Sequence, residues 1–270
     1  MNIEGKVAWI TGASSGIGAA LARQWSARGG YVILSGRNLA RLERVADAVA
    51  TEALVLPFDV RDDNGLAKAT ASALGWKGGV DVGVANAGIS QRSAAIDTDM
   101  GVYREIIEVD LIAQIAFAQR LIGPMSARGS GSLAFISSIA GKVGVPMRTA
   151  YSAAKFGLAG YADALRGELS QSGVTVHAIY PGSIRTDVSR NALTSDGSVR
   201  GKSDKAIDEG IDPDEAANTM LDAIGAGQRE IIVARGPELA MGEARRTPDA
   251  LFDQVAAMVA AGYMERLKEG

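Results

Sequence analysis

A serine, a tyrosine and a lysine near the middle of the chain have the types and spacing of a proton-transfer site. Tyr151 and Lys155 are four residues apart in a segment with a helical pattern, so their side chains share one helix face. Ser138 ends the apolar run before that helix. A phenol is a slow acid at neutral pH, but an ammonium about 4 Å away stabilises its anion by about 4 kcal/mol at an effective dielectric of about 20. Because a serine hydroxyl can donate to an oxygen that gains negative charge, the three groups could protonate the alkoxide left by hydride addition to a carbonyl.

A glycine-rich turn offers a site for the anion of a dinucleotide. The segment Thr11-Gly12-Ala13-Ser14-Ser15-Gly16-Ile17-Gly18 leaves the first apolar run and opens the first helical pattern. A helix N-terminus presents free N–H groups and a positive dipole end, and glycine lets a pyrophosphate approach the backbone closely. Alone, such a cluster could be a tight turn without a ligand, but its position after a first strand favours dinucleotide binding.

The residues after the second apolar run favour NADP(H) over NAD(H). An enzyme that uses NAD commonly carries an acidic residue here, which binds the ribose hydroxyls. This chain reads Leu34-Ser35-Gly36-Arg37-Asn38 instead. A guanidinium can bind a 2′-phosphate with two hydrogen bonds, so Arg37 is the predicted selectivity residue and Arg41 a weaker candidate. The alternative is that Arg37 is an exposed loop charge.

Short apolar runs alternate with longer helical patterns along the chain. This alternation predicts right-handed βαβ units in a Rossmann-type, doubly wound parallel α/β sheet of about seven strands, three layers deep, within a single domain over residues 1–270. The predicted strands are Val7–Thr11, Tyr31–Ser35, Ala53–Phe58, Val80–Ala85, Leu133–Ser137, Val174–Tyr180 and Glu230–Ala234. The predicted helices are Gly16–Arg28, Leu39–Ala50, Asp62–Trp76, Met100–Arg128, Ala150–Ser172 and Asp214–Ala226.

Two segments interrupt this alternation. Residues 191–210 are polar and follow the sixth predicted strand, where a loop would overhang a bound cofactor, so we expect a mobile lid there. Residues 237–270 form a predicted helical tail, whose apolar stripe we expect to pack on the domain or on a partner subunit rather than on a membrane. The stripe comprises Leu251, Phe252, Val255, Met258 and Val259.

Composition excludes several classes of function. The 270 residues carry 28 basic and 31 acidic side chains, so the net charge of −3 gives no electrostatic basis for nucleic-acid binding. The absence of cysteine excludes disulfides and cysteine-ligated zinc, and we predict no metal site. The single histidine, His177, alternates with Val176 and Ile179 in a buried-strand pattern and is predicted to be structural. No apolar run reaches the length of a membrane span, and no leader pattern is present, so we expect a cytoplasmic protein.

These motifs together resemble the short-chain dehydrogenase/reductase family over roughly residues 5–235. The resemblance rests on the glycine-rich turn, Asn86-Ala87-Gly88, Ser138, Tyr151-x-x-x-Lys155 and Pro181-Gly182. It implies an NADP(H)-dependent oxidoreductase that moves hydride between nicotinamide and a small-molecule carbonyl or secondary alcohol. By this resemblance Tyr151 is the general acid/base, Lys155 assists it and binds the nicotinamide ribose, and Ser138 orients the substrate oxygen.

The resemblance also implies a set of cofactor contacts. Asp59 resembles the acid that contacts adenine, Asn86 the residue that steadies the central strand, and Ile184 and Thr186 the contacts after Pro181-Gly182. The full predicted set is Gly12, Ser14, Ser15, Gly16, Ile17, Gly18, Arg37, Asn38, Asp59, Val60, Asn86, Ala87, Gly88, Tyr151, Lys155, Pro181, Gly182, Ile184 and Thr186.

Residues 139–151 and 191–198 resemble the hydroxysteroid-dehydrogenase-like branch of the family, whose substrates vary. Family members commonly pair through two long helices, so the resemblance implies a homodimer or homotetramer through residues 100–128 and 150–172. Two other functions stay open. One is a non-catalytic NADP-binding regulatory protein, and the other is a dehydratase or epimerase on the same scaffold.

One residue departs from the family pattern. Asp110 stands where the family usually has an asparagine that completes a proton relay from the lysine. It is included among the predicted catalytic residues, because its oxygens can still accept a hydrogen bond from water. A carboxylate near Lys155 would oppose the effect of the ammonium on the phenol, so we expect an active enzyme with a higher pH optimum.

Overall fold

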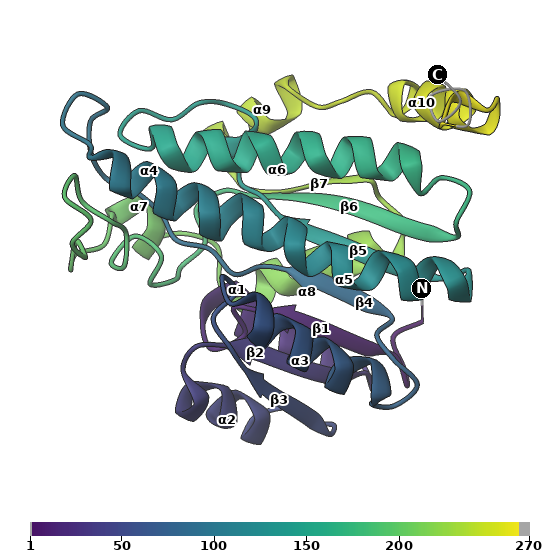
Figure 1. Cartoon of the computed structure of the whole chain (residues 1–270). Helices are drawn as coiled ribbons and strands as arrows, with labels where there is room; N and C mark the ends of the chain where they lie inside the picture. The colour runs from purple at the N-terminus through teal and green to yellow at the C-terminus, as the bar shows by residue number, and fades with distance from the viewer. Residues whose placement is uncertain (1, 265–270) are drawn as a thin grey trace.

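Seven short apolar segments form one parallel sheet in the computed structural model, which describes residues 2–264. The sheet order is β3-β2-β1-β4-β5-β6-β7, and every neighbouring pair is parallel. Helices cover both faces (Figure 1), which is why the central strands are apolar along their whole length. The strands are β1 (Val7–Thr11), β2 (Tyr31–Gly36), β3 (Ala53–Pro57), β4 (Val82–Ala85), β5 (Gly131–Ile136), β6 (Val174–Pro181) and β7 (Glu230–Val233).

The predicted doubly wound fold is confirmed, and its strand order creates a crevice. The chain runs outward from β1 to β2 and β3, then returns to place β4 on the other side of β1. The carboxyl ends of β1 and β4 therefore diverge into connections on opposite faces. In open α/β sheets, ligands bind at this switch point.

The helices divide into two layers around separate apolar cores. One core lies under α1 (Gly16–Ala27), α2 (Leu39–Asp47) and α8 (Pro213–Gly225). The other lies under α3 (Asp63–Gly75), α5 (Ala113–Arg128) and α6 (Thr149–Glu168). The remaining helices are α4 (Met100–Ile107), α7 (Lys205–Asp208), α9 (Gly236–Ala244), α10 (Asp249–Ala260) and the short 3₁₀ turn η2 (Ile139–Gly141).

The predicted helix 100–128 is not a regular α-helix throughout. Between α4 and α5 the chain forms a π-helical turn, η1 (Glu108–Ile112). Such turns insert an extra residue and are frequent at functional sites. Asp110 lies in this turn and is fully buried, so the irregularity carries the residue that departs from the family pattern.

The segment predicted as a lid has defined backbone contacts. Leu193 bridges Gln91 on one side and Val199 on the other, and the segment ends in α7. The predicted mobility of residues 191–210 stays a prediction.

The predicted tail forms α9 and α10, and α10 packs over the C-terminal end of α6 (Figure 1). Of the predicted apolar stripe, Phe252 is buried against the guanidinium of Arg166, at 4.2 Å from the ring centroid, whereas Leu251 and Met258 are exposed. The stripe therefore packs only in part on the domain. Residues 265–270 of the predicted tail lie outside the described residues.

Candidate active site

The glycine-rich turn is shaped so that its backbone meets the strand beside it. Gly12 and Gly16 have positive φ angles of 66° and 53°. A Cβ on Gly18 would lie 2.5 Å from the carbonyl oxygen of Gly12, and one on Gly12 would lie 2.8 Å from the Cα of Ala87. Ser15 precedes α1 without capping it through its side chain. The first N–H groups of α1 thus remain available to an anion, which fits the pyrophosphate of a dinucleotide.

Asn86 and Thr11 join β1 to β4 at their carboxyl ends. The amide nitrogen of the Asn86 side chain donates to the carbonyl oxygen of Thr11 at 2.9 Å. The Thr11 hydroxyl accepts from the backbone N–H groups of Asn86 and Ala87, at 3.0 and 3.1 Å. These bonds hold the segment Asn86-Ala87-Gly88 beside the glycine-rich turn.

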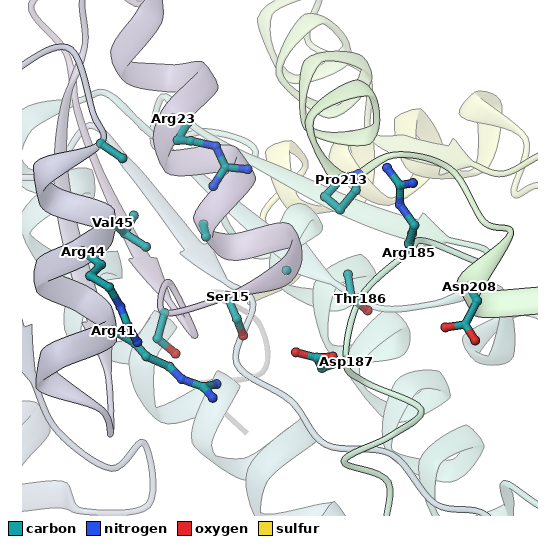
Figure 2. Close-up of a pocket in the computed structure, with 14 residues that line it drawn as sticks. Ser15, Arg23, Arg41, Arg44, Val45, Arg185, Thr186, Asp187, Asp208 and Pro213 are labelled. Carbon is teal, nitrogen blue, oxygen red and sulfur yellow. The ribbon is translucent and has the colours of Figure 1, made fainter. Parts of the chain in front are cut away.

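A cavity of about 540 Å³ opens beside this turn. Ser14, Ser15 and Gly16 line it, together with Thr186 from the segment after β6. Figure 2 shows Arg41 and Arg44 of α2 on one side of Ser15, and Thr186 and Asp187 on the other. The cavity is large enough for part of a dinucleotide.

Arginines give this cavity its charge. Arg41, the weaker predicted selectivity residue, lines it, and so does Arg44, which sequence reasoning missed although its spacing from Arg41 puts both on one helix face. Arg23 and Arg185 also line it but are paired with Asp214 and Asp212. Arg37 is exposed and does not line the cavity.

Four other residues that were predicted to contact the cofactor bond to or pack against the protein itself. Both carboxylate oxygens of Asp59 accept from Arg61, at 3.0 and 2.7 Å. The Arg61 guanidinium outweighs burial and, with a contribution from Arg37, lowers the pKa of Asp59 to about 2. The Asn38 side chain caps α2 by accepting from the N–H of Arg41 at 3.0 Å. Ile17 and Val60 are half-buried and pack against the two cores.

The predicted catalytic groups meet where β5 ends and α6 begins. The Lys155 ammonium lies 5.6 Å from the centroid of the Tyr151 ring. Ser138 is half-buried, and its hydroxyl accepts from the N–H of Ala140 at 3.1 Å and faces the carbonyl oxygen of Pro181 at 3.4 Å. Ser138 thereby lies beside Pro181, and Tyr151 is half-buried.

Lys155 is held from three directions. Its ammonium donates to the carbonyl oxygen of Ile136 at 3.0 Å and lies 3.1 Å from a carboxylate oxygen of Asp110. The Ser137 hydroxyl donates to the backbone carbonyl of Lys155 at 2.9 Å, fixing α6 against the end of β5. Burial alone would lower the pKa of Lys155, but the attraction of Asp110 raises it, so the side chain stays an ammonium.

Asp110 links Lys155 to the segment after β4. Its other carboxylate oxygen accepts from the N–H of Ile89 at 2.8 Å, and a Cβ on Gly88 would lie 3.0 Å from the oxygen that faces Lys155. Burial raises the pKa of Asp110, and Lys155 and Ile89 offset this rise only in part. The carboxylate thus joins Lys155 to the backbone of the segment after β4.

Two residues that sequence reasoning missed support these segments. The Gln114 side chain donates to the carbonyl oxygens of Ala87 and Val109, which ties the π-helical turn to the segment after β4. Glu238 of α9 accepts from the backbone N–H of Ser183 at 2.7 Å and from its hydroxyl at 2.9 Å. A Cβ on Gly182 would lie 2.4 Å from this carboxylate. Polar residues in helices carry no local signal of such distant partners.

Gly182, Ile184 and Thr186 follow β6 as the motif predicted. Ile184 is buried, while Thr186 reaches the cavity beside the glycine-rich turn. A Cβ on Gly16 would lie 3.1 Å from the Thr186 side chain, so the two segments touch.

Within residues 2–264, no group of three or more histidine, cysteine, aspartate or glutamate side chains could hold a metal ion. Over the same residues, no helix has the length and apolarity required to cross a bilayer.

Comparison with known proteins identifies the family to which this chain is similar. The profile of the short chain dehydrogenase family matches residues 6–196. Dehydrogenase/reductase SDR family member 7B of Danio rerio is 36% identical over 250 residues, which cover 89% of this chain and 81% of the relative. Dehydrogenase/reductase SDR family protein 7-like of Drosophila melanogaster is 38% identical over 239 residues, covering 86% and 73%.

Solved structures of dehydrogenases have the same fold as this chain. A short-chain dehydrogenase from Streptomyces avermitilis superposes with a TM-score of 0.78 at 27% identity, covering 97% of this chain and 99% of the other. An alcohol dehydrogenase from the archaeon Thermococcus sibiricus, solved in complex with 5-hydroxy-NADP, has a TM-score of 0.75 at 24% identity, covering 86% and 98%. The second likeness shows the shared fold alone.

Proposed function

The chain belongs to the short-chain dehydrogenase/reductase family, and from that premise we propose that it transfers hydride between bound NADP(H) and a carbonyl or secondary alcohol. The observation that carries the proposal is the Lys155 ammonium beside the Tyr151 ring at the carboxyl end of the sheet. A dinucleotide fits the glycine cradle, where a Cβ at Gly12 or Gly18 would collide with backbone or with Asn86.

Each catalytic residue then has a defined task. The nicotinamide, when bound, supplies or accepts the hydride. Tyr151 donates its phenolic proton to the oxygen of the carbonyl being reduced, and takes a proton from the alcohol in the reverse direction. Lys155 stabilises the phenolate, and the Ser138 hydroxyl donates to the same substrate oxygen, where negative charge develops.

The charge beside the glycine-rich turn supports a preference for NADP(H) over NAD(H). Arg41 and Arg44 line the cavity next to Ser14, and neither forms an ion pair within residues 2–264. Arg37 stands where NAD enzymes commonly have an acid. A 2′-phosphate would therefore meet guanidinium groups and no carboxylate from the end of β2.

NADPH absorbance measured with a panel of ketones and aldehydes tests the proposal. We expect turnover by the wild type, and a fall of about 10²- to 10⁴-fold in kcat for Tyr151→Phe with NADPH binding retained. Tyr161→Phe is the matched control, since Tyr161 lies on the same helix and, within residues 2–264, its hydroxyl bonds only Gln119.

The same assay separates the alternatives. Saturable NADPH binding without turnover of any carbonyl or alcohol would favour the non-catalytic regulatory protein. Product formation without net oxidation of NADPH would favour a dehydratase or epimerase. Equal turnover by the wild type and Tyr151→Phe would overturn the assigned role of the phenol.

The predicted homodimer or homotetramer is part of the proposal. The outer surfaces of the two implied helices leave Ile112 and Phe156 exposed, which supports an apolar contact there. Sedimentation of the wild type against Phe156→Glu tests it, with a shift to monomer expected. The cytoplasmic location stays a prediction that cell fractionation can check, and the hydroxysteroid-dehydrogenase-like branch also stays a prediction.

A further inference from the structure

A second cavity, of about 570 Å³, lies next to the residues that lead into α6. On one side the loop Val145–Arg148 lines it, three residues before Tyr151. On the other side Thr194, Arg200, Lys202 and Asp204 line it, all within or beside the segment predicted as a lid. It shares no lining residue with the cavity beside the glycine-rich turn. The position suits the part of a substrate that extends away from the reacting oxygen.

The charges around this second cavity are unbalanced. Four cationic side chains line it, but only one carboxylate, Asp204, does so; the cations are Arg92, Arg148, Arg200 and Lys202. Asp204 accepts from Nε of Arg92 at 2.7 Å and from Arg200 at 2.5 Å, and these bonds outweigh its burial and hold its pKa below the usual range. The one carboxylate is thus hydrogen-bonded to two guanidinium groups, and it also forms an ion pair with a third, that of Arg148.

Arg148 is left without a hydrogen-bond partner. Its side chain is only 25% exposed, and its guanidinium forms an ion pair with the shared carboxylate of Asp204 at 3.6 Å. Within residues 2–264 its guanidinium makes no hydrogen bond, although it has five donors. Burial, together with repulsion from Arg92, lowers the pKa of Arg148. A largely buried guanidinium whose N–H groups donate no hydrogen bond is costly unless a further anion binds it.

Glu238, the other acid near Arg148, does not neutralise the excess positive charge around this cavity. Glu238 attracts Arg148 electrostatically, but its two carboxylate oxygens accept from the backbone and hydroxyl of Ser183. Arg148 is the N-cap residue of α6 and stands three residues before Tyr151, so both side chains belong to the same end of that helix. The unsatisfied charge therefore lies within the reach of a small substrate held at Tyr151.

We propose that this cavity binds an anionic group of the substrate, a carboxylate or a phosphate, with Arg148 as the principal contact and Lys202 as a second. The inference rests on the proposed function and names its substrate class, a carbonyl compound or alcohol that carries an anion. The planar guanidinium can bind two oxygens of either anion at once, and the surplus positive charge compensates the desolvation of both.

Matched substrate pairs test the proposal. Each pair compares a keto acid with its methyl ester, or a phosphorylated ketone with its unphosphorylated parent, at fixed ionic strength with saturating NADPH. We expect the wild type to favour the anionic member by about tenfold or more in kcat/KM, as charge-assisted hydrogen bonds typically allow. The class of anion that gives the larger gain in kcat/KM, carboxylate or phosphate, identifies the group that the cavity binds.

Two variants locate the effect. Arg148→Gln should raise KM for the anionic members by about tenfold while turnover of the neutral members changes little, and Arg148→Lys should restore part of the loss. Lys202→Gln, on an exposed side chain, should give a smaller change in the same direction and guards against misfolding of the first variant. Lys68→Gln removes a charge from the exposed face of α3 and is the control.

A binding measurement separates this inference from the proposed function. With NADPH bound, inorganic phosphate or acetate should raise the melting temperature of the wild type more than sodium chloride does, and less so in Arg148→Gln and Lys202→Gln. Reduction of neutral ketones with no preference for anions, and no anion-specific stabilisation, would overturn the inference and leave the proposed function intact. Loss of NADPH turnover with every substrate, while the anion effect persists, would overturn the function instead.

Discussion

A carboxylate oxygen of Asp110 lies 3.1 Å from the ammonium of Lys155, and the two side chains are 0% and 4% exposed. The pair is formed at the point where the π-helical turn η1 brings Asp110 inward towards α6. Since Lys155 also lies beside the Tyr151 ring, the negative charge of Asp110 offsets part of the field that the ammonium exerts on the phenol.

Replacing Asp110 by asparagine should move the pH–rate profile to lower pH. Without the carboxylate, the positive charge of Lys155 acts unopposed and stabilises the phenolate of Tyr151. The rising limb for alcohol oxidation should therefore begin at lower pH, and the falling limb for carbonyl reduction should move the same way. Initial rates across pH with one alcohol and its ketone check this. Profiles that coincide with the wild type would exclude the electrostatic role.

Removing Arg41 or Arg44 from the cavity beside the glycine-rich turn should weaken selectivity for the phosphorylated cofactor. Arg41→Ala and Arg44→Ala should each raise KM for NADPH, by about tenfold if the guanidinium bonds the 2′-phosphate, and leave KM for NADH nearly unchanged. Arg37→Asp should shift the preference towards NADH, because a carboxylate repels the phosphate. Kinetics with both cofactors measure this, and Arg104→Ala, on the exposed side of α4, is the control. An unchanged ratio of the two efficiencies in every variant would remove these residues from cofactor selection.

The ion pair between Lys142 and Glu230 should matter to stability only when one partner is lost. Their charged atoms are 2.8 Å apart, and the side chains are 5% and 4% exposed. Lys142→Met should lower the free energy of unfolding by about 3–5 kcal/mol, because it leaves an unpaired buried carboxylate. The double variant Lys142→Met, Glu230→Leu should recover most of that loss. Thermal and urea unfolding test this, and a double variant as unstable as the single one would contradict the account.

His177 should make the protein less stable in mild acid. Burial lowers its pKa, and its Nδ1 donates to the carbonyl oxygen of Gln228 at 2.6 Å, so the folded state holds the neutral ring. The unfolded chain binds a proton near the ordinary value of about 6.5, so the stabilisation is present above that pH and is lost as pH falls below it. Melting temperatures between pH 7.5 and 5.5 should fall more steeply for the wild type than for His177→Gln. Parallel curves would show that another group is responsible.

The sequence predicted the order of the elements well because the central strands are buried on both faces and most helices pack one face on a core. For example, β1 was predicted as Val7–Thr11 and is found there. The ends of the elements were predicted less well. The helix predicted over 150–172 ends at Glu168, and the N–H of the next residue, Leu169, donates to the carbonyl oxygens of Leu165 and Gly167. Nothing in the residue pattern of 100–128 signalled the π-helical turn, since its insertion depends on what packs against it.

The candidate site was predicted as residue types but not as contacts. Tyr151 and Lys155 share a helix face by spacing alone, and this part needed no tertiary structure. The sequence singled out Arg148 only as one residue of the segment 139–151, which resembles the hydroxysteroid-dehydrogenase-like branch. Its lack of hydrogen bonds emerges from its burial against Arg92 and Asp204, which come from distant segments.

By itself, the sequence determined the alternating α/β fold, the glycine cradle and the phenol–ammonium pair, because periodicity and short-range spacing act through neighbouring residues. Only the tertiary structure decided which charges meet. The Asp110–Lys155 pair, the Glu238 contact with Ser183 and the surplus charge around Arg148 each join segments tens of residues apart. Electrostatic energies depend on distance in space and on burial, and neither quantity is contained in the order of residues along the chain.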